Sequence, residues 1–264
     1  AAAGRGPRLT ARSTLIIKLG AIGDVVMAAP MASALKRAHP GIWVSWLAGR
    51  GVVPLLRLLP DIDEIVEIDE AALLTGNSRA RVGVMAAAAK QLRMRRFDLL
   101  LNGHPDPRYR ILEQLVRAGT VRRFSRNPRE RIMPVPGRYH GHEYVRLALG
   151  GDGPELSALL PEAIHPPLPG SVELPGDRPL VAIAPGGARN VINDNEVRRW
   201  PLERYVDLSA ALDRDGVSTV VVGGPGDSWV SEAFEGRDHV IDLVGRTSLP
   251  DLLAVYAECD AVVS

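Results

Sequence analysis

The stretch LIIKLGAIGDVVMAAP, residues 15–30, decides the fold of this chain. Its apolar start at Leu15–Ile17 is typical of a buried strand. Gly20–Gly23 then allows a tight turn, because glycine tolerates backbone angles that other residues avoid. A helical pattern begins at Asp24, so strand, turn and helix follow one another as in the first unit of a doubly wound α/β domain. This order predicts Asp24 at the carboxyl end of the strand, where such sheets bind ligands.

Length and composition are those of an ordinary globular protein. The 264 residues favour two domains of roughly 100–150 residues each. A formal net charge of +1 gives no global basic field, so no nucleic-acid partner is expected. A single cysteine, Cys259, excludes an intrachain disulfide framework and fits a reducing compartment. No apolar run approaches the ~18 residues that span a bilayer, and we expect a flexible tail at 1–12 on a cytoplasmic protein.

Strands and helices alternate in two blocks, 13–150 and 180–264. Between them, residues 151–179 are rich in proline, which removes backbone donors and fixes backbone angles, so this segment is predicted to be a linker. Both blocks should form mostly parallel sheets. The helices expected from the pattern are 24–38, 52–59, 82–94, 108–118, 139–149, 201–212 and 247–258.

Two glycine-rich loops follow predicted strands in the second block. PGGARN at 185–190 offers backbone N–H groups that, with Arg189 beside them, can hold a diphosphate. The Arg198–Arg199 pair precedes a helix, and either guanidinium can clamp an anion. In GGPGD at 223–227, the carboxylate of Asp227 can accept hydrogen bonds from ribose hydroxyls. Each loop alone fits a surface turn equally well. Together with the Gly20–Asp24 turn they favour a functional site, because all three should lie at carboxyl strand ends, on rims that can face a shared cleft.

Asp24 has two interpretations. It can simply cap a helix, which stabilises a protein by about 1 kcal/mol, or it can act as a general base that removes a proton from an attacking hydroxyl. The turn is neither a dinucleotide fingerprint nor a P-loop, because it lacks a third glycine and a Gly-Lys-Ser/Thr sequence. His104 and Arg108 follow the predicted strand 98–101 and either face an acceptor or lie solvated in a loop. No cluster with metal-ligand spacing is evident.

Four motifs, taken in order, resemble glycosyltransferase family 9, the ADP-heptose:lipopolysaccharide heptosyltransferases. They are LIIKLGAIGDVVMAAP, PGGARN followed by RRWP, VVVGGPGD, and LVGRTSLPDLLAVYAECDAVVS. The resemblance covers Leu15–Ser264 and implies a GT-B fold, with two Rossmann-like domains facing across a cleft. It also implies inverting, metal-independent transfer without a cofactor. The sugar, a heptose, would pass from a nucleotide-diphosphate donor such as ADP-heptose to a hydroxyl of a glycan or lipopolysaccharide-core-like acceptor.

The resemblance also implies roles for individual residues. Asp24 matches the catalytic carboxylate of the family, and the first domain would hold the acceptor. The expected donor-binding residues are Gly186, Gly187, Arg189, Arg198, Arg199, Gly224, Asp227, Thr247, Ser248 and Leu249. The expected acceptor-binding residues are Gly23, His104 and Arg108. The family's Asp-Ser/Thr-Gly-x-x-His loop would follow the strand 261–263, where this sequence ends, so the second domain is expected to be incomplete.

Other interpretations stay open from the sequence alone. The missing loop is compatible with a nucleotide-sugar-binding protein without catalysis, or with an inactive fragment. A Rossmann-type oxidoreductase is less well supported, because no G-x-G-x-x-G occurs. The basic segment RRFSRNPRER, 122–131, either meets an anionic acceptor or lipid surface or forms a solvated loop. Peripheral contact with the cytoplasmic face of the inner membrane is a further expectation.

Overall fold

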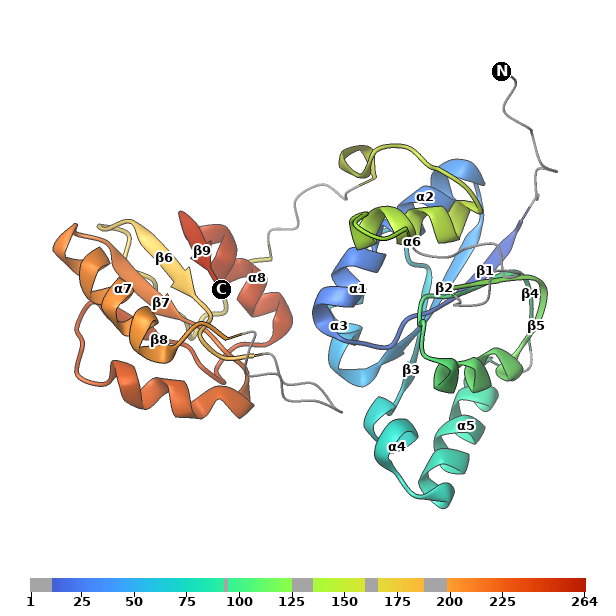
Figure 1. The fold of residues 1–264 in the computed structure, drawn as a ribbon, viewed down its shortest axis with the longest axis horizontal. Helices are drawn as coiled ribbons and strands as arrows, with labels where there is room; N and C mark the ends of the chain where they lie inside the picture. Colours follow the sequence, from blue (N-terminus) through green and yellow to red (C-terminus); the bar gives the residue numbers. More distant parts are fainter. Residues whose placement is uncertain (1–10, 93–94, 125–134, 160–165, 188–198) are drawn as a thin grey trace. The chain divides into compact units, whose positions relative to one another are not determined.

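The computed structural model describes residues 11–92, 95–124, 135–159, 166–187 and 199–264. These residues form two compact units, which divide between Glu162 and Ala163 (Figure 1). The division lies inside the proline-rich segment 151–179. Each unit has its own parallel sheet and its own hydrophobic core.

The first unit contains a five-stranded sheet in the order β3-β2-β1-β4-β5, with every neighbouring pair parallel. The order changes direction between β1 and β4. In open α/β sheets this reversal, at the carboxyl ends of the strands, is where ligands bind. Helix α1 (Ile22–Ala28), which carries Asp24, begins after the turn that follows β1, and the loop with His104 follows β4. The strands are β1 (Ser13–Ile17), β2 (Trp43–Gly49), β3 (Glu64–Ile68), β4 (Arg96–Asn102) and β5 (Arg117–Arg123).

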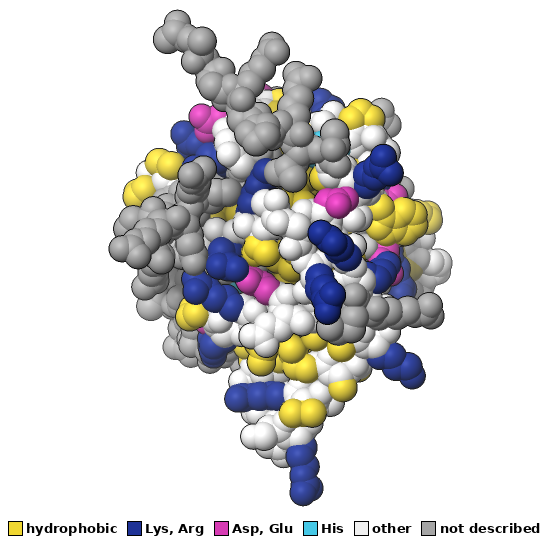
Figure 2. All heavy atoms as spheres, turned by 90° about the vertical axis from the view of Figure 1, so that its right-hand side faces the viewer, with side chains coloured by type: hydrophobic (Ala, Val, Ile, Leu, Met, Phe, Trp, Pro, Cys, Tyr) yellow, Lys and Arg dark blue, Asp and Glu magenta, His cyan; other side chains and the backbone are white. Residues whose placement is uncertain are grey.

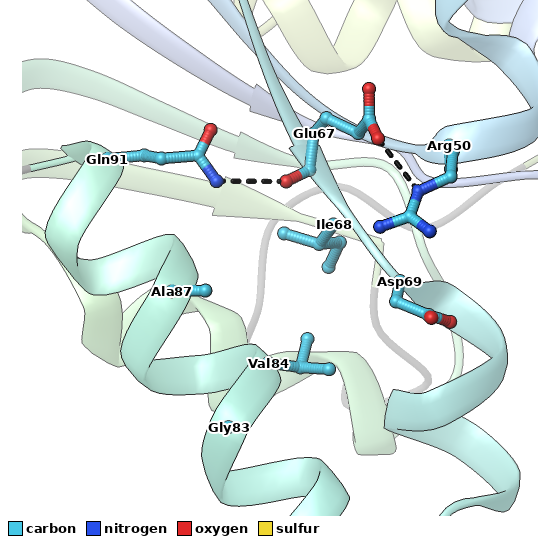
Figure 3. Close-up of a pocket in the computed structure, with 8 residues that line it drawn as sticks. All are labelled: Arg50, Glu67, Ile68, Asp69, Gly83, Val84, Ala87 and Gln91. Atoms are coloured by element: carbon cyan, nitrogen blue, oxygen red, sulfur yellow. Dashed lines mark hydrogen bonds and ion pairs between the residues drawn. The ribbon is translucent and has the colours of Figure 1, made fainter.

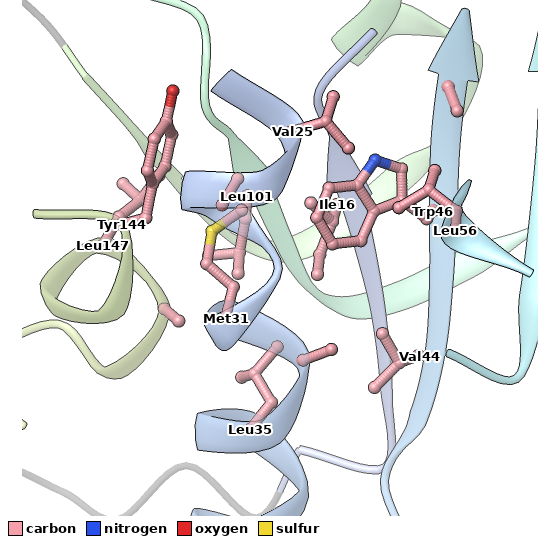
Figure 4. Packing of buried hydrophobic residues seen from close by; sticks show 14 of the residues in the cluster. Ile16, Val25, Met31, Leu35, Val44, Trp46, Leu56, Leu101, Tyr144 and Leu147 are labelled. Atoms are coloured by element: carbon pink, nitrogen blue, oxygen red, sulfur yellow. The ribbon is translucent and has the colours of Figure 1, made fainter. Parts of the chain in front are cut away.

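Helices cover both faces of this sheet, because successive residues of a buried strand point to opposite sides. Ile16 and Trp46 pack with α1, α2 and α6 on one face (Figure 4), whereas Leu15 and Ile17 pack with α5 and η2 on the other. The α-helices are α1 (Ile22–Ala28), α2 (Pro30–Ala38), α3 (Val53–Leu56), α4 (Glu70–Thr75), α5 (Ser78–Leu92) and α6 (His140–Leu149). The 3-10 helices are η1 (Arg50–Val52), η2 (Pro107–Leu115) and η3 (Leu156–Ala158).

Three helices of this unit differ from the sequence prediction. The single helix expected over 24–38 is two helices, because Pro30 has no N–H to continue the first one and instead occupies the first turn of α2. The helix expected over 108–118 is the 3-10 helix η2, and β5 begins directly after it. The short helix α4, which Asp69 caps by accepting a hydrogen bond from the Ala72 N–H, was not expected.

The second unit contains a four-stranded parallel sheet in the order β8-β7-β6-β9. Its order reverses between β6 and β9, and the first glycine-rich loop follows β6 at that point. Helix α8 begins as the sequence predicts, with a capping box between Ser248 and Asp251. The strands are β6 (Leu180–Ile183), β7 (Ser218–Val221), β8 (Val240–Asp242) and β9 (Ala261–Val263), and the helices are α7 (Leu202–Arg214), η5 (Pro225–Phe234) and α8 (Leu249–Glu258).

Trp46 links the first core to the turn after β1, and this link is testable. Its ring is fully buried, and its Nε1 donates a hydrogen bond to the Lys18 carbonyl oxygen at 2.9 Å. Trp46→Phe removes this donor and leaves a small void, so the free energy of unfolding should fall by about 1–3 kcal/mol in urea titrations. Trp43→Phe, on the same strand but half exposed, should change it by less than about 0.5 kcal/mol. Equal losses in both variants would contradict the prediction.

Candidate active site

Asp24 lies in the first turn of α1 and forms an ion pair with a buried lysine. Its Oδ2 is 2.8 Å from the Nζ of Lys18, which follows β1 directly. The Lys18 side chain is 2% exposed, whereas that of Asp24 is 43% exposed. The positive charge therefore lies inside the fold, and the carboxylate faces solvent at the carboxyl end of β1.

The turn between Lys18 and Asp24 packs against a second carboxylate, that of Glu70. A Cβ on Gly20 would lie 2.7 Å from Oε2 of Glu70, so only glycine allows this close approach. Burial lowers the pKa of Lys18 below its ordinary 10.5, because desolvation disfavours the ammonium, while the charges of Asp24 and Glu70 oppose that shift. The ring of Tyr144, on α6, has its centroid 5.9 Å from the same Nζ. Burial, together with the Asp24 charge, raises the pKa of the Tyr144 phenol.

His104 supports the turn from the neighbouring strand. Its Nε2 accepts a hydrogen bond from the Leu19 N–H at 2.9 Å, which places the imidazole proton on Nδ1. Its ring stacks on Tyr109 with centroids 3.7 Å apart, and the Tyr109 hydroxyl donates to Glu70 Oε1 at 2.8 Å. Burial and the Lys18 charge lower the pKa of His104 well below 6.5. His104 is 6% exposed, so its predicted contact with an acceptor would have to be made by that small surface.

The other two residues expected at the acceptor are exposed. Gly23 lies beside Asp24, and a Cβ built on it would meet nothing within 4 Å. Arg108 opens η2 and donates from Nε and Nη2 to Oδ2 of Asp106 at 2.8 and 2.6 Å. The structure therefore brings Gly23 to the Asp24 turn and holds Arg108 in a local ion pair. Their contact with an acceptor stays a prediction.

In the second unit, Asp227 joins the two glycine-rich loops. Its Oδ1 accepts a hydrogen bond from the Gly187 N–H at 2.9 Å, and its Oδ2 accepts one from the Gly224 N–H at 2.8 Å. A Cβ on Gly186 would lie 2.4 Å from the Asp227 Cγ. The Gly187 N–H, which the sequence assigned to the donor diphosphate, is thus already bonded within the fold. Each carboxylate oxygen has a second lone pair, so Asp227 retains acceptor capacity for a ribose hydroxyl.

Two further segments meet these loops. The Nε of Arg199 donates to the Gly187 carbonyl oxygen at 2.9 Å, and its guanidinium lies 5.8 Å from the centroid of the Trp229 ring. The Gly245 N–H donates to the Gly223 carbonyl oxygen at 2.9 Å, which ties the loop before α8 to the others. Thr247, Ser248 and Leu249 follow that loop at the start of α8. Arg189 and Arg198 lie outside the described residues.

Sequence reasoning missed the residues that support Asp24: Lys18, Glu70, Tyr109 and Tyr144. One signal was present, because Lys18 interrupts the apolar run LIIKLG, and a lysine is almost never fully buried unless it is paired. The others come from distant elements that only the fold brings together.

A pocket of about 460 Å³ opens beside β3 and α5 (Figure 3). Its polar groups bond to one another, since Arg50 pairs with Glu67 at 2.8 Å and the Gln91 amide donates to the Glu67 carbonyl oxygen at 3.1 Å. None of the predicted site residues lines it. This pocket is therefore separate from the loops at the point where the strand order reverses.

Basic side chains are spread over the visible face rather than gathered in one patch (Figure 2). Of the predicted basic segment, residues 125–131 lie outside the described part. Arg122 donates to the Ala148 carbonyl oxygen, and Arg123 pairs with Glu113 at 2.7 Å. These two arginines are therefore engaged within the fold.

Neither a metal centre nor a membrane-spanning helix occurs among the described residues. No three His, Cys, Asp or Glu side chains gather there in a group able to hold a metal ion. No helix in the same ranges combines the length and apolarity that crossing a membrane requires.

Known proteins resemble this chain in sequence and in fold. A family model described as glycosyltransferase family 9 (heptosyltransferase) matches residues 157–264. The lipooligosaccharide heptosyltransferase 2 of Haemophilus influenzae is 22% identical, over 95% of this chain and 76% of that protein. The solved glycosyl transferase family 9 structure from Veillonella parvula has a TM-score of 0.73 at 19% identity, over 95% of this chain and 74% of that one. E. coli heptosyltransferase WaaC with ADP-2-deoxy-2-fluoro heptose has a TM-score of 0.71 at 17% identity, over 96% and 82%.

The two parallel α/β units thus have the GT-B type of fold, which defines a class of glycosyltransferases. Within that class, the chain resembles the heptosyltransferases of glycosyltransferase family 9, through the family model on residues 157–264 and the relatives at about 20% identity. The fold class and the resemblance to glycosyltransferase family 9 expected from the sequence are confirmed.

Because Gly186 lies in close contact with Asp227, any side chain at position 186 should lower the unfolding free energy of the second unit. Gly186→Ala forces the Asp227 carboxylate away from the Gly187 and Gly224 N–H groups, so the second unit should lose about 1–3 kcal/mol of unfolding free energy in urea. Gly226→Ala provides the matched control, because its Cβ would meet nothing within 4 Å, and it should leave stability unchanged or slightly higher. An unchanged unfolding free energy in Gly186→Ala would contradict the proposed role of the Asp227 contacts.

His104 predicts a pH dependence of stability. Between its lowered folded pKa and about 6.5, the unfolded chain binds more protons at this residue, so stability is full above pH 6.5 and falls as the pH drops below it. The slope is up to about 1.4 kcal/mol per pH unit. His104→Gln retains an acceptor for the Leu19 N–H and does not titrate, so urea titrations from pH 7.5 to 5 should give a shallower slope. His142→Gln, at an exposed histidine, should leave the slope unchanged.

Proposed function

We propose that the protein transfers a sugar, a heptose, from a nucleotide-diphosphate donor of the ADP-heptose type to a hydroxyl of a lipopolysaccharide-core-like glycan. The proposal draws support from the family model on the second unit and from relatives named as heptosyltransferases along the whole chain. The observation that carries it is the half-exposed Asp24 carboxylate, held at the sheet reversal of the first unit by an ion pair. No cofactor or resident metal is part of the proposal.

In this reaction Asp24 is the general base. The acceptor hydroxyl gives its proton to the carboxylate as its oxygen attacks the anomeric carbon from the face opposite the nucleotide. The bond between the anomeric carbon and the diphosphate oxygen breaks, and the electron pair leaves with the nucleotide. Because one displacement occurs, the configuration at the anomeric carbon is inverted.

The second unit would bind the donor. Arg199, beside the Gly187 loop, supplies a cation where negative charge grows on the departing diphosphate. Asp227 offers its remaining lone pairs to the ribose hydroxyls, and Thr247–Leu249 would line the nucleoside pocket. Arg189 and Arg198 remain predicted donor contacts. Membrane contact and a cytoplasmic location also remain expectations.

Asp24→Asn tests the proposal directly. The amide cannot accept the proton, so kcat should fall by about 10²–10⁴-fold, measured as transfer product by mass spectrometry with ADP-heptose and a core-oligosaccharide acceptor. Donor affinity, measured by calorimetry with ADP, should not change. Asp152→Asn, at a largely exposed carboxylate, is the control and should keep full turnover.

The outcomes separate the alternatives. Unchanged turnover in Asp24→Asn would remove Asp24 from the role of base. Binding of ADP-heptose by the wild-type chain without any product would instead favour a nucleotide-sugar-binding protein without catalysis.

A further inference from the structure

We propose that Lys18 is a positioning residue for Asp24, because its buried ammonium fixes Oδ2 of the carboxylate and leaves Oδ1 to receive the proton of the acceptor hydroxyl. This inference rests on the proposed function, in which Asp24 is the base. The contact is direct, at 2.8 Å from Nζ to Oδ2. Among the described residues, no hydrogen bond to Oδ1 of Asp24 occurs.

The lysine itself is held rigidly. Its N–H donates to the Leu47 carbonyl oxygen at 3.2 Å, and its own carbonyl oxygen accepts from the Trp46 Nε1 at 2.9 Å. The side chain leaves this fixed backbone with only 2% exposure. Lys18 thus extends from a hydrogen-bonded backbone at the sheet to a carboxylate at the solvent boundary.

Stability does not explain a lysine at this position. Burying an ammonium is unfavourable even when it is paired, and an apolar side chain of similar volume is often as stable or more so. Asp24 is half exposed, so water would solvate it without Lys18. The pair Lys36–Asp63 in the same unit differs, because both side chains are partly exposed and Lys36 also donates to the Ile42 carbonyl oxygen. That second pair is a structural link.

The groups around Lys18 come from four elements and favour the charged amine. Asp24 on α1 and Glu70 on α4 supply negative charge, and Tyr144 on α6 presents its ring. His104, after β4, has its pKa lowered by burial and also by the Lys18 charge, so it stays neutral beside the ammonium. The positioning role requires the protonated lysine, since a neutral amine would no longer attract the carboxylate.

The pH profile of turnover is the first test. In the wild type, kcat should fall on the alkaline side, below pH 10.5, as Lys18 loses its proton. Tyr109 and Tyr144 do not account for this limb, because burial raises the pKa of both phenols. Lys18→Met should reduce kcat by about 10- to 100-fold with the donor KM unchanged, and the alkaline limb should vanish. Lys18→Arg, which stays charged, should recover part of kcat and also lack the limb.

Stability distinguishes positioning from a structural role. Lys18→Met should unfold at the same or a higher urea concentration than the wild type, although it turns over slowly. Lys36→Met is the matched control and should unfold earlier while keeping the wild-type alkaline limb. If Lys18→Met unfolds earlier and its folded fraction turns over normally, the lysine is structural and the inference is wrong.

A third measurement does not depend on activity. The pKa of Lys18, followed by NMR at Nζ, should be lower in Asp24→Asn than in the wild type, because the carboxylate charge and hydrogen bond raise it. An unchanged pKa of Lys18 in Asp24→Asn would overturn this inference and leave the proposed function unaffected. Absence of transfer product from the wild-type chain would overturn the proposed function, and the titration would still decide whether Lys18 holds Asp24.

Discussion

The candidate site of the first unit is arranged around one positive charge buried at the end of β1. Lys18 is almost fully buried, so its ammonium has to be balanced by the groups that surround it. Asp24 supplies the direct partner at 2.8 Å, and Glu70 adds a second negative charge nearby. His104 meets the same constraint by staying neutral and using Nε2 as an acceptor for the Leu19 N–H. The turn after β1, the stacked rings of His104 and Tyr109 and the start of α1 are therefore all arranged around the charge of Lys18.

The two sheets share one local arrangement after their first strands. In each, a carboxylate lies directly under a glycine that follows the first strand of the sheet, Glu70 under Gly20 and Asp227 under Gly186. A side chain on either glycine would occupy the space of the carboxylate. The glycines are thus explained by close packing of an acidic side chain, and positive φ angles are needed only at positions such as Gly187.

Much of this architecture follows from the sequence, because it depends on local patterns. The apolar runs predict β1 and β6, the residues from Thr247 onward predict a helix that corresponds to α8, and the glycine loops predict turns at the carboxyl strand ends. Proline chemistry also predicts the division of helix 24–38 at Pro30, although the apolar pattern alone predicts one continuous helix. The surroundings of Lys18 were not predictable, because Glu70, His104 and Tyr144 come from separate elements and meet this lysine only in the folded sheet. The helix η5 was not predicted, because the glycines and the proline at its start resemble a plain loop.

The different surroundings of the two acidic residues give them different chemistry. Asp227 accepts two backbone N–H groups, so its carboxylate primarily fixes the shape of the loops. Among the described residues, Asp24 has one side-chain partner, the buried Lys18, and its carboxylate is half exposed to solvent. A group that transfers protons needs such an open side, whereas a group that shapes a binding loop needs its oxygens occupied. The pattern of hydrogen bonds therefore favours Asp24 over Asp227 as the base, independently of the resemblance to any family.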